Sequence, residues 1–441
     1  MSFTAPQNTG EENGLPARRA AYDIVNQILF QKRNMDDAFT ACTGLDALPP
    51  RDRAFTRLLV SLILKRAPEM DRALAALLHE PISTLKPPQL VNIFRLGIAQ
   101  FVFLKTPAHA AVNTTVELAE AEGIVHHKPL VNAVMRRLTR EGLEPLPPRE
   151  AGRVATPEWL WHEWVNDYGV ELALDIAAAN LEEGAVDVTV KRDPEGWAEK
   201  LNGTLMPSGS IRLSGGGFIP DLPGFAEGEW WIQGAAAALP AKLFGDLQGK
   251  TVIDLCAAPG GKTAQLAAMG ATVTALDRSA MRVKRLDENM ARLGFTVETV
   301  IADGATWQPK ERADAVLLDA PCSATGTIRH QPDVLRLKDI RDQEKLAALQ
   351  RRLLVNALDM LKPGGTLVYC TCSLQKAEGE SQTTWLLQQA LPVQLASITA
   401  GEIGGMEEML CARGDVRCLP QHFAGYGGSD GFYIARFRRN A

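Results

Sequence analysis

The 441-residue sequence has no apolar run near the roughly 20 residues that a helix needs to cross a bilayer. Its beginning, residues 1–16, is polar and lacks both the hydrophobic segment of a secretory signal and the arginine-rich pattern of a transit peptide. We therefore expect residues 1–16 to form a flexible tail, and we expect a cytoplasmic protein that does not bind a membrane.

The sequence also lacks a regular cysteine pattern. Its seven cysteines are odd in number and scattered, which argues against a disulfide framework. Cys370 and Cys372 could begin a zinc site, but no second Cys-x-x-Cys or His pair stands at ligand spacing, and a structural zinc ion needs four ligands. The sequence predicts reduced thiols and no metal site.

A strong excess of one charge is lacking as well. The net charge is -5, which argues against a strongly basic nucleic-acid protein, although residues 15–142 hold 17 Lys and Arg against 12 Asp and Glu. This local excess fits either a solvated helical surface or contact with phosphates.

The chain is longer than one hydrophobic core usually serves, so we expect two or three domains.

Residues 17–143 predict an all-helical domain with short connections. Apolar side chains recur there at helical spacing, in segments that Pro and Gly separate. The predicted helices are 18–30, 51–64, 70–78, 89–103, 112–121 and 130–138.

Residues 150–230 follow a Pro- and Glu-rich link, 144–150, and predict a small α+β module. Its predicted elements are helices 157–168 and 170–180, a strand 186–191 and a glycine-rich loop 214–217. Three tryptophans, Trp159, Trp161 and Trp164, lie on the first of these helices, and we interpret them as core and interface aromatics rather than base-stacking platforms.

From residue 231 to 441, apolar strands alternate with helices, which is typical of a parallel, doubly wound sheet of Rossmann-like type. The predicted strands are 252–255, 273–276, 297–301, 315–318 and 366–369. The predicted helices are 235–243, 263–269, 281–293 and 340–361.

The turn after the first of these strands is a candidate cofactor site. A strand that turns into a helix through glycines offers free backbone N–H groups and a positive helix end. A P-loop is excluded, because Cys256 stands where that motif requires glycine. The candidate residues are Cys256, which we interpret as a packing thiol, and Ala257, Ala258, Pro259, Gly260, Gly261 and Lys262.

Acidic residues stand at the ends of the first three strands, at Asp254, Asp277 and Asp303. Asp277 is placed to bond ribose hydroxyls, and Asp303 could accept from an adenine amino group, although either could instead cap a following helix. Because the G-x-G-x-x-G turn of dinucleotide sites is absent, we prefer S-adenosylmethionine to NAD as the cofactor.

Two cysteines carry the reaction that the sequence suggests. Cys322, in Asp-Ala-Pro-Cys, and Cys372, in Thr-Cys-Ser, each follow an apolar run, so each should lie where a strand opens onto a cleft. Two thiols there favour covalent chemistry. Cys370 shares the strand face of Cys372, so chemistry alone allows either as nucleophile, while position near the open strand end favours Cys372.

Four motifs resemble those of RNA cytosine-5 methyltransferases. They are D-x-C-A-A-P-G-G-K-T at 254–263, D-A-P-C-S-A-T-G at 319–326, G-G-T-L-V-Y-x-T-C-S at 364–373 and D-G-F-Y-I-A-R-F at 430–437. Segments 17–20, 93–97, 107–113 and 130–137 resemble NusB-like RNA-binding domains in order and spacing. Together they are similar to the RsmB (Fmu/Sun) family of 16S ribosomal RNA cytosine-5 methyltransferases, over about residues 17–441.

The resemblance implies a role for each of four residues. Carbon 5 of cytosine is a poor nucleophile, so a thiolate must first add to carbon 6, and a second group must help to remove the carbon 5 proton. In the family these roles map onto Cys372 and Cys322, respectively. Asp319 would bond the pyrimidine edge beside the S-adenosylmethionine site, and Lys262 would support Asp319 and favour a thiolate.

Two other functions remain as alternatives. One is a transfer-RNA cytosine-5 methyltransferase, which the NusB-like segments disfavour. The other is a non-catalytic RNA-binding assembly factor with a vestigial cofactor fold, which the intact cysteine pair opposes. The resemblance implies 16S ribosomal RNA as the partner, and we expect a monomer.

Overall fold

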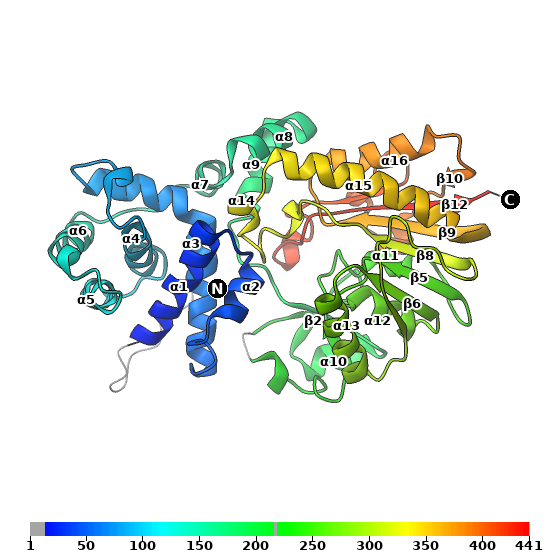
Figure 1. Ribbon diagram of the computed structural model, residues 1–441, viewed down its shortest axis with the longest axis horizontal. Helices are drawn as coiled ribbons and strands as arrows, with labels where there is room; N and C mark the ends of the chain where they lie inside the picture. The colour runs from blue at the N-terminus through cyan, green and yellow to red at the C-terminus, as the bar shows by residue number, and fades with distance from the viewer. Residues whose placement is uncertain (1–13, 216–217, 441) are drawn as a thin grey trace. The chain divides into compact units, whose positions relative to one another are not determined.

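The computed structural model describes residues 14–215 and 218–440 (Figure 1). Most of the predicted tail 1–16 and the second half of the predicted loop 214–217 lie outside the described residues. The chain forms two compact units: one contains residues up to 162, 170–182 and 330–338, and the other contains the remainder. No helix within the described ranges is long and apolar enough to span a membrane.

The first unit is helical. Its α-helices are α1 (Leu15–Gln31), α2 (Met35–Ala41), α3 (Pro50–Leu77), α4 (Leu90–Ile98), α5 (Ala108–Ala121), α6 (Lys128–Glu141), α7 (Pro148–Ala155), α9 (Val170–Ala179) and α14 (Val334–Leu337). The apolar faces of α1 to α6 bury side chains such as Ile24, Ile63 and Phe94 in one core. The pattern did not predict α2, and α7 begins inside the predicted link 144–150.

Helix α3 corrects the prediction of two helices, 51–64 and 70–78. It runs through Pro68, which has no N–H group to donate to the carbonyl of Leu64. Arg336, 272 positions beyond Leu64, donates to that carbonyl instead, from Nε at 3.0 Å. The helix therefore continues because a distant side chain satisfies the acceptor that the proline leaves open.

Residues 330–338 form part of the helical unit although they follow the Cys322 motif in sequence. The carboxylate of Asp333 accepts from the backbone N–H of Met35 at 2.9 Å, and Leu337 packs against the helical core. These contacts, with that of Arg336, hold the segment on α2 and α3.

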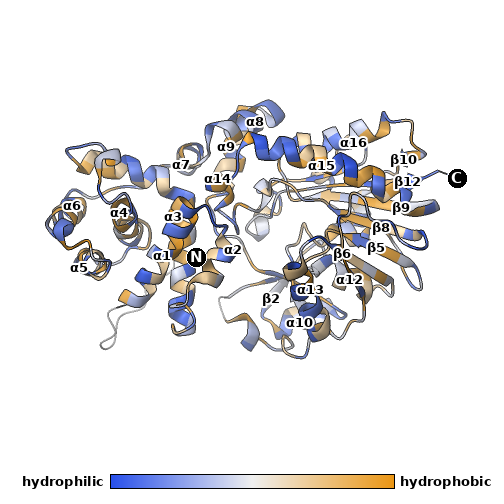
Figure 2. Ribbon diagram, in the orientation of Figure 1, coloured by the Kyte–Doolittle hydropathy of each residue, from blue (hydrophilic) through white to orange (hydrophobic). Residues whose placement is uncertain are grey.

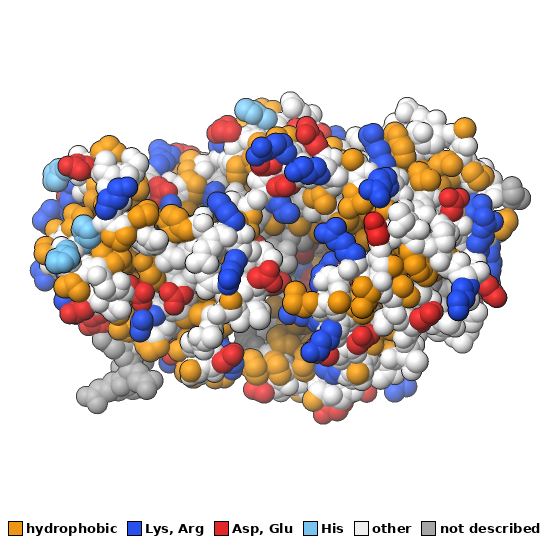
Figure 3. All heavy atoms as spheres, in the orientation of Figure 1, with side chains coloured by type: hydrophobic (Ala, Val, Ile, Leu, Met, Phe, Trp, Pro, Cys, Tyr) orange, Lys and Arg blue, Asp and Glu red, His pale blue; other side chains and the backbone are white. Residues whose placement is uncertain are grey.

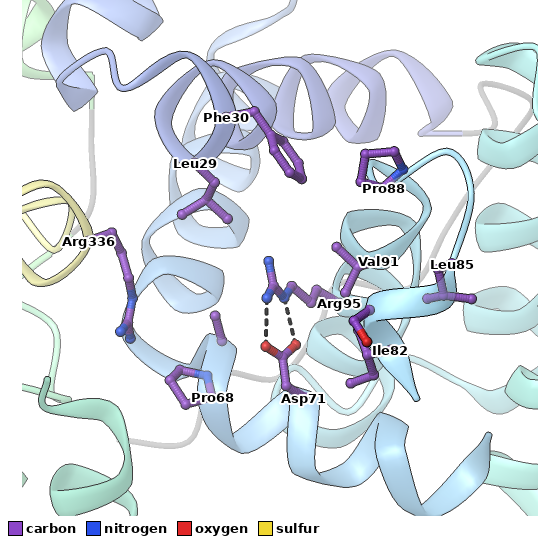
Figure 4. A pocket seen from close by; sticks show the side chains of 12 residues that line it. Leu29, Phe30, Pro68, Asp71, Ile82, Leu85, Pro88, Val91, Arg95 and Arg336 are labelled. Atoms are coloured by element: carbon purple, nitrogen blue, oxygen red, sulfur yellow. Dashed lines mark hydrogen bonds and ion pairs between the residues drawn. The ribbon is translucent and has the colours of Figure 1, made fainter. Parts of the chain in front are cut away.

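The helical unit contains a cavity of about 410 Å³ (Figure 4). Asp71 and Arg95 face each other in it and are joined by two hydrogen bonds of 2.8 and 2.6 Å. Phe30 and Val91 give the cavity apolar walls. Its lining contains no cysteine, so it is not the site that the two thiols predict.

Ion pairs occupy several of the basic side chains in the helical unit. Arg19 pairs with Glu122, Arg95 with Asp71 and Arg137 with Glu141. On the face of the molecule drawn in Figure 3, side chains of both charges are interspersed. These pairs join residues that are already counted on both sides, so the excess of 17 Lys and Arg over 12 Asp and Glu in residues 15–142 remains.

The second unit is built on an eight-stranded sheet with the order β10-β12-β9-β8-β5-β6-β7, in which β11 pairs with β12. Its strands are β5 (Thr251–Leu255), β6 (Thr272–Asp277), β7 (Glu298–Ile301), β8 (Ala313–Asp319), β9 (Leu361–Thr371), β10 (Val393–Leu395), β11 (Val416–Cys418) and β12 (Phe432–Arg439). Strands β5 to β9 are parallel.

The prediction of a parallel sheet is wrong at one edge. Strand β12 runs antiparallel to β9, β10 and β11. Parallel neighbours are usually joined by a crossover helix, and the segment 419–431 between β11 and β12 contains no α-helix. The D-G-F-Y motif thus forms a return strand, which the alternating pattern upstream did not indicate.

Helices cover both faces of the large sheet (Figure 1). Helices α11 (Leu239–Lys242), α12 (Gly261–Ala268) and α13 (Ala280–Leu293) pack on one face, and α15 (Ile340–Asp359) and α16 (Glu380–Leu387) pack on the other. Figure 2 shows that the central strands are mainly hydrophobic and that helices such as α15 are amphipathic, as expected for a sheet buried on both faces.

A smaller antiparallel sheet precedes these elements in the second unit. Its strands are β1 (Asp187–Val190), β2 (Gly203–Leu205), β3 (Ile211–Leu213) and β4 (Trp230–Ile232), with α10 (Pro194–Lys200) packed on it. Asp187 accepts two hydrogen bonds from Arg212 and a third, at 3.0 Å, from the backbone N–H of Ala235. Residues 235–238 form turns, so the predicted helix 235–243 is shortened to α11.

Helix α8 (Glu158–Tyr168) passes from the first unit to the second. It carries the three tryptophans, of which Trp164 is completely buried and Trp159 and Trp161 are half-buried. Arg153 lies over the ring of Trp161, 4.7 Å from its centroid. At least Trp164 is therefore a core residue, as the usual burial of tryptophan predicts.

Candidate active site

The order of the parallel strands locates the site. Strand β5 lies between β6 and β8, so the direction in which successive strands are added reverses beside it. Ligands of doubly wound sheets bind at such reversals, outside the carboxyl ends of the strands. The residues that follow β5, β8 and β9 include Cys256, Cys322 and Cys372, respectively.

The turn between β5 and α12 depends on two left-handed backbone positions, Cys256 with φ 62° and Gly260 with φ 103°. Gly260 is the N-cap residue of α12, and a Cβ atom there would lie 3.1 Å from Leu286 Cγ. The first N–H groups of α12, including those of Gly261 and Lys262, have no carbonyl partner within the helix. The predicted turn thus has the geometry of an anion or cofactor cradle.

Cys256 itself is half-buried in this turn. Burial, with Asp277 and Asp319 nearby, raises the pKa of its thiol to about 12. The thiol therefore stays protonated near neutral pH, which fits the interpretation of Cys256 as a packing residue.

Asp254 lies beneath the turn. Its carboxyl group is fully buried and accepts from the hydroxyl of Thr263 at 2.6 Å. Burial raises the pKa of Asp254 to about 7, against the opposing effect of the Thr263 hydrogen bond. Because the side chain is fully buried and bonded to the first turn of α12, it braces the turn.

Replacing Asp254 with asparagine should change how stability depends on pH. A raised folded-state pKa means that the contribution of Asp254 is full below about pH 4 and is lost as the pH rises toward about 7. The loss amounts to up to about 4 kcal/mol, and asparagine, which mimics the protonated acid, should remove it. Urea unfolding of both proteins at pH 5 and pH 8 measures the larger part of this loss.

Asp314→Asn is the matched control for that experiment. Asp314 lies on the same strand as Asp319, and its bond to Lys362 lowers its pKa to about 2, so its titration lies below the tested window. An Asp254→Asn protein with the same pH dependence as the wild type would show that Asp254 is ionised throughout.

Asp277 and Asp303 follow the next two strands. Asp277 is 2% exposed, accepts from the Ser279 N–H at 3.0 Å and pairs with Arg282 at 3.1 Å. Ser279, rather than Asp277, caps α13. Asp303 is exposed and accepts from the Ala305 N–H at 2.9 Å.

These groups suit an adenosine ligand. Carboxylate oxygens accept from hydroxyl and amino groups, and the first turn of α12 offers N–H donors. A Cβ atom on Gly261, at the start of that turn, would be in van der Waals contact with Trp231 and Gln233, at 3.8 and 3.9 Å. The donor and acceptor set therefore fits S-adenosylmethionine.

The two predicted cysteines meet at the carboxyl ends of β8 and β9. Their sulfur atoms lie 3.4 Å apart, and both side chains are half-buried. The hydrogen bond with Cys372 and then burial raise the pKa of Cys322 well above its ordinary value. Cys322 therefore stays protonated near neutral pH, and its S–H group can donate to the Cys372 sulfur.

Cys370 has a different environment, although it shares a strand face with Cys372. It is fully buried, and its thiol donates to Asp319 Oδ1 at 3.5 Å. Burial raises the pKa of Cys370 well above its ordinary value. The structure thus separates the two candidate nucleophiles, because only Cys372 has exposed surface and faces Cys322.

Lys262 connects the cofactor turn to the cysteines. Its Nζ lies 2.8 Å from Asp319 Oδ2 and 5.1 Å from the ring centroid of Phe432. Burial alone would lower the pKa of Lys262, but Asp319, Cys370 and Cys372 together raise it above its usual value. A permanent cation therefore stands beside the site and favours thiolate at a neighbouring cysteine.

Two motif glycines lock the backbone around Cys372. The Gly326 N–H donates to the Cys372 carbonyl at 2.9 Å, and the Gly431 N–H donates to the Gly326 carbonyl at 2.8 Å. A Cβ atom on Gly326 would lie 2.0 Å from the Gly431 carbonyl oxygen, so only glycine fits. This close contact explains why the motif at 319–326 ends in a glycine, Gly326, and why the motif at 430–437 has a glycine, Gly431, as its second residue.

Sequence reasoning missed a group of polar side chains behind the cysteines. Ser323, Ser373, Gln375 and Glu378 are all fully buried and bonded to one another. The only sequence signal was a serine directly after each motif cysteine. No group of three potential metal ligands occurs in the part of the chain that the structure describes.

The fold and this strand-end site define a Rossmann-like, S-adenosylmethionine-dependent methyltransferase with a helical companion unit. Residues 243–438 match the family model of the 16S rRNA methyltransferase RsmB/F, and residues 15–140 match that of the NusB family. The crystal structure of PH0851 has the same fold, with a TM-score of 0.78 and 22% identity over 98% of this chain and all of that one.

Curated relatives extend this similarity over nearly the whole chain. The ribosomal RNA small subunit methyltransferase B of Xanthomonas campestris is 34% identical over 96% of this chain and 97% of its own length. That of Vibrio cholerae is 33% identical over 95% and 96%. The chain therefore belongs to the ribosomal RNA small subunit methyltransferase B family, and it is an RNA methyltransferase that uses S-adenosylmethionine.

Proposed function

We propose that the protein methylates carbon 5 of a cytosine in 16S ribosomal RNA through a covalent bond between Cys372 and carbon 6. The observation that carries the proposal is the 3.4 Å separation of the Cys372 and Cys322 sulfurs at the ends of β9 and β8. Methyl transfer to an amino group needs no thiol, whereas carbon 5 must first be activated by a nucleophile at carbon 6.

The Cys372 thiolate forms a sulfur–carbon bond to carbon 6, and the π electrons of the carbon 5–carbon 6 double bond become available at carbon 5. S-adenosylmethionine, when bound, supplies a methyl group that is electrophilic because it is attached to a sulfonium. The carbon 5 proton must then leave, so that its electron pair restores the double bond and the bond to the Cys372 sulfur breaks.

Cys322 assists that release. Its raised pKa keeps it protonated while Cys372 attacks, and a donor 3.4 Å away stabilises a thiolate at Cys372. In the elimination step Cys322 takes up the carbon 5 proton as it gives its own proton to the departing Cys372 sulfur, so that both residues end as thiols.

Lys262 and Asp319 orient the base and support the charge. Asp319 keeps acceptor capacity toward a pyrimidine edge, while its 2.8 Å contact with Lys262 fixes the carboxylate. The residues that hold the cofactor are those of the turn from Cys256 to Lys262, together with Asp277, Asp303 and Asp319. The turn gives N–H donors, and the acids accept from ribose and adenine groups.

Lys262→Met should slow formation of the covalent adduct by about 10²-fold, because the cation beside the thiols is lost. The rising limb of the pH–rate profile should also move to higher pH, since a thiolate is less favoured without that charge. Rapid-quench measurement of adduct formation across pH 6–9 checks both effects. Lys250→Met, which changes an exposed lysine, is the control.

We further propose the arrangement of the remaining chain. Residues 17–143 act as a NusB-like RNA-binding domain, residues 150–230 as a linking module and residues 231–441 as the methyltransferase domain. The match to the NusB family over residues 15–140 supports the first assignment. The protein acts as a cytoplasmic monomer on ribosomal RNA.

The test is to incubate the protein with labelled S-adenosylmethionine and unmodified small-subunit RNA, and then to locate the label. We expect 5-methylcytosine in 16S ribosomal RNA. Label on an amino group or a ribose would overturn the cysteine chemistry, and label only in transfer RNA would overturn the proposed substrate.

A further inference from the structure

A buried carboxylate lies between the two loops that carry the paired cysteines. Glu378, at the end of a short 3-10 helix (Lys376–Glu378) before α16, has no exposed surface. Its backbone carbonyl accepts from the hydroxyls of Tyr369 and Thr371, at 2.7 and 3.2 Å, which fixes the residue against β9. The side chain is thereby directed into the protein interior.

The partners of the Glu378 carboxylate are the neighbours of both cysteines. Oε2 accepts from the hydroxyl of Ser323 at 2.5 Å and from that of Ser373 at 2.6 Å. Oε1 accepts from the Ser323 backbone N–H at 3.0 Å. Ser323 directly follows Cys322 and Ser373 directly follows Cys372, so one oxygen atom joins the two loops.

A third element completes the arrangement. Gln350, on α15, donates to Glu378 Oε1 at 3.1 Å and to the carbonyl of Pro321 at 2.9 Å. Pro321 directly precedes Cys322. The Cys322 loop is therefore held on both sides of the cysteine by contacts that involve Glu378 or its partner.

We propose that Glu378 is a positioning residue that sets the separation of the Cys322 and Cys372 sulfur atoms for methyl transfer. The inference rests on the proposed function in one respect. The distance between the two sulfur atoms matters for turnover only if both thiols act on the same base. A buried carboxylate is costly, and here four hydrogen-bond donors from both loops and α15 compensate it. An apolar residue would fill the volume but would join nothing.

Other contacts between the loops remain when Glu378 is removed. The Gly326 N–H still bonds the Cys372 carbonyl, and the Leu374 N–H bonds the Thr325 hydroxyl at 3.0 Å. Glu378→Ala should therefore loosen the spacing of the sulfurs without separating the loops. A displacement near 1 Å at a reacting group costs about 10²-fold in rate.

The first measurement is methyl transfer by the full-length protein. We expect Glu378→Ala to lower kcat by about 10²-fold while the KM for S-adenosylmethionine stays within about 2-fold. Glu378→Gln should keep activity within about 5-fold of the wild type. Its amide oxygen can accept from the Ser323 N–H and from Gln350, and its NH₂ group can donate to the two serine hydroxyls once these rotate. A residue needed only for folding would not show this split or this recovery.

The second measurement reports the thiol spacing without RNA or turnover. Phenylarsine oxide condenses with two close thiols, forming two arsenic–sulfur bonds and releasing water. All proteins in this experiment carry Cys370→Ala, which leaves Cys322 as the neighbour of Cys372. We expect the protein with no further change to bind the arsenical and the Glu378→Gln variant to bind it equally well. The Glu378→Ala variant should bind it about 10-fold more weakly. Cys322→Ala should abolish capture, and Glu402→Ala, whose acid bonds Thr399 and Arg436, should leave it unchanged.

The outcomes separate this inference from the proposed function. A folded Glu378→Ala protein with normal kcat and normal arsenical capture would overturn the positioning role. If that variant fails to fold, the Ser323→Ala/Ser373→Ala protein replaces it. This protein lacks both hydroxyl hydrogen bonds to Glu378 and keeps those from the Ser323 N–H and from Gln350. Unchanged arsenical binding by this protein would also overturn the positioning role. Altered capture without any cytosine methylation in the wild type would uphold the positioning role and refute the function of the pair.

Discussion

Cys372→Ala is expected to lower methyl transfer by about 10⁴-fold or more, because removal of a covalent nucleophile leaves only binding and electrostatic contributions. The variant should fold normally, since the Cys372 side chain is only half-buried and its loop is held through backbone bonds. The measurement is the single-turnover rate with labelled S-adenosylmethionine and saturating RNA, together with the thermal midpoint of the protein.

Cys370→Ala is the control for this experiment. It removes a thiol two residues away that is buried and bonded to Asp319, and we expect it to keep turnover within about 10-fold of the wild type. The opposite pattern, with an active Cys372→Ala protein and an inactive Cys370→Ala protein, would transfer the role of nucleophile to Cys370.

Cys322→Ala is expected to trap the protein on its substrate. Addition at carbon 6 and methylation can still occur through Cys372, but the assistance to elimination is lost, so turnover should fall by about 10²- to 10³-fold. A protein–RNA species stable in denaturing gels should accumulate, and it should require S-adenosylmethionine.

The Cys322→Ala/Cys372→Ala protein controls for this adduct, because it lacks the sulfur that would form the bond. An adduct in that double variant, or none in Cys322→Ala alone, would refute the proposed division of roles. Since Cys322 and Cys372 lie 3.4 Å apart, their effects on rate should not be additive.

Much of the fold could be predicted because local patterns and long-range structure agree. The strand, turn and helix from Thr251 to Ala268 follow from an apolar run, two glycines and a helical repeat. Those signals are local. The meeting of Cys322 with Cys372 also followed, since parallel strands end at the same edge of a sheet.

The parts that could not be predicted depend on distant partners. Continuity of α3 through Pro68 requires Arg336, which no local pattern around the proline reveals. The antiparallel edge depends on how β12 returns to β9. No local pattern marks Glu378, and its burial is apparent only when the serines of two separate motifs converge on it.

The course of the chain through residues 330–338 has a consequence for dissection of the protein. A fragment that ends near residue 182 would lack Arg336, Asp333 and Leu337, and would expose the apolar surface and the open carbonyl of α3 that they cover. A fragment that begins near residue 183 would carry that segment without the helices on which it folds. Segments of the two units therefore alternate along the chain. A single truncation cannot yield either unit complete and free of residues from the other.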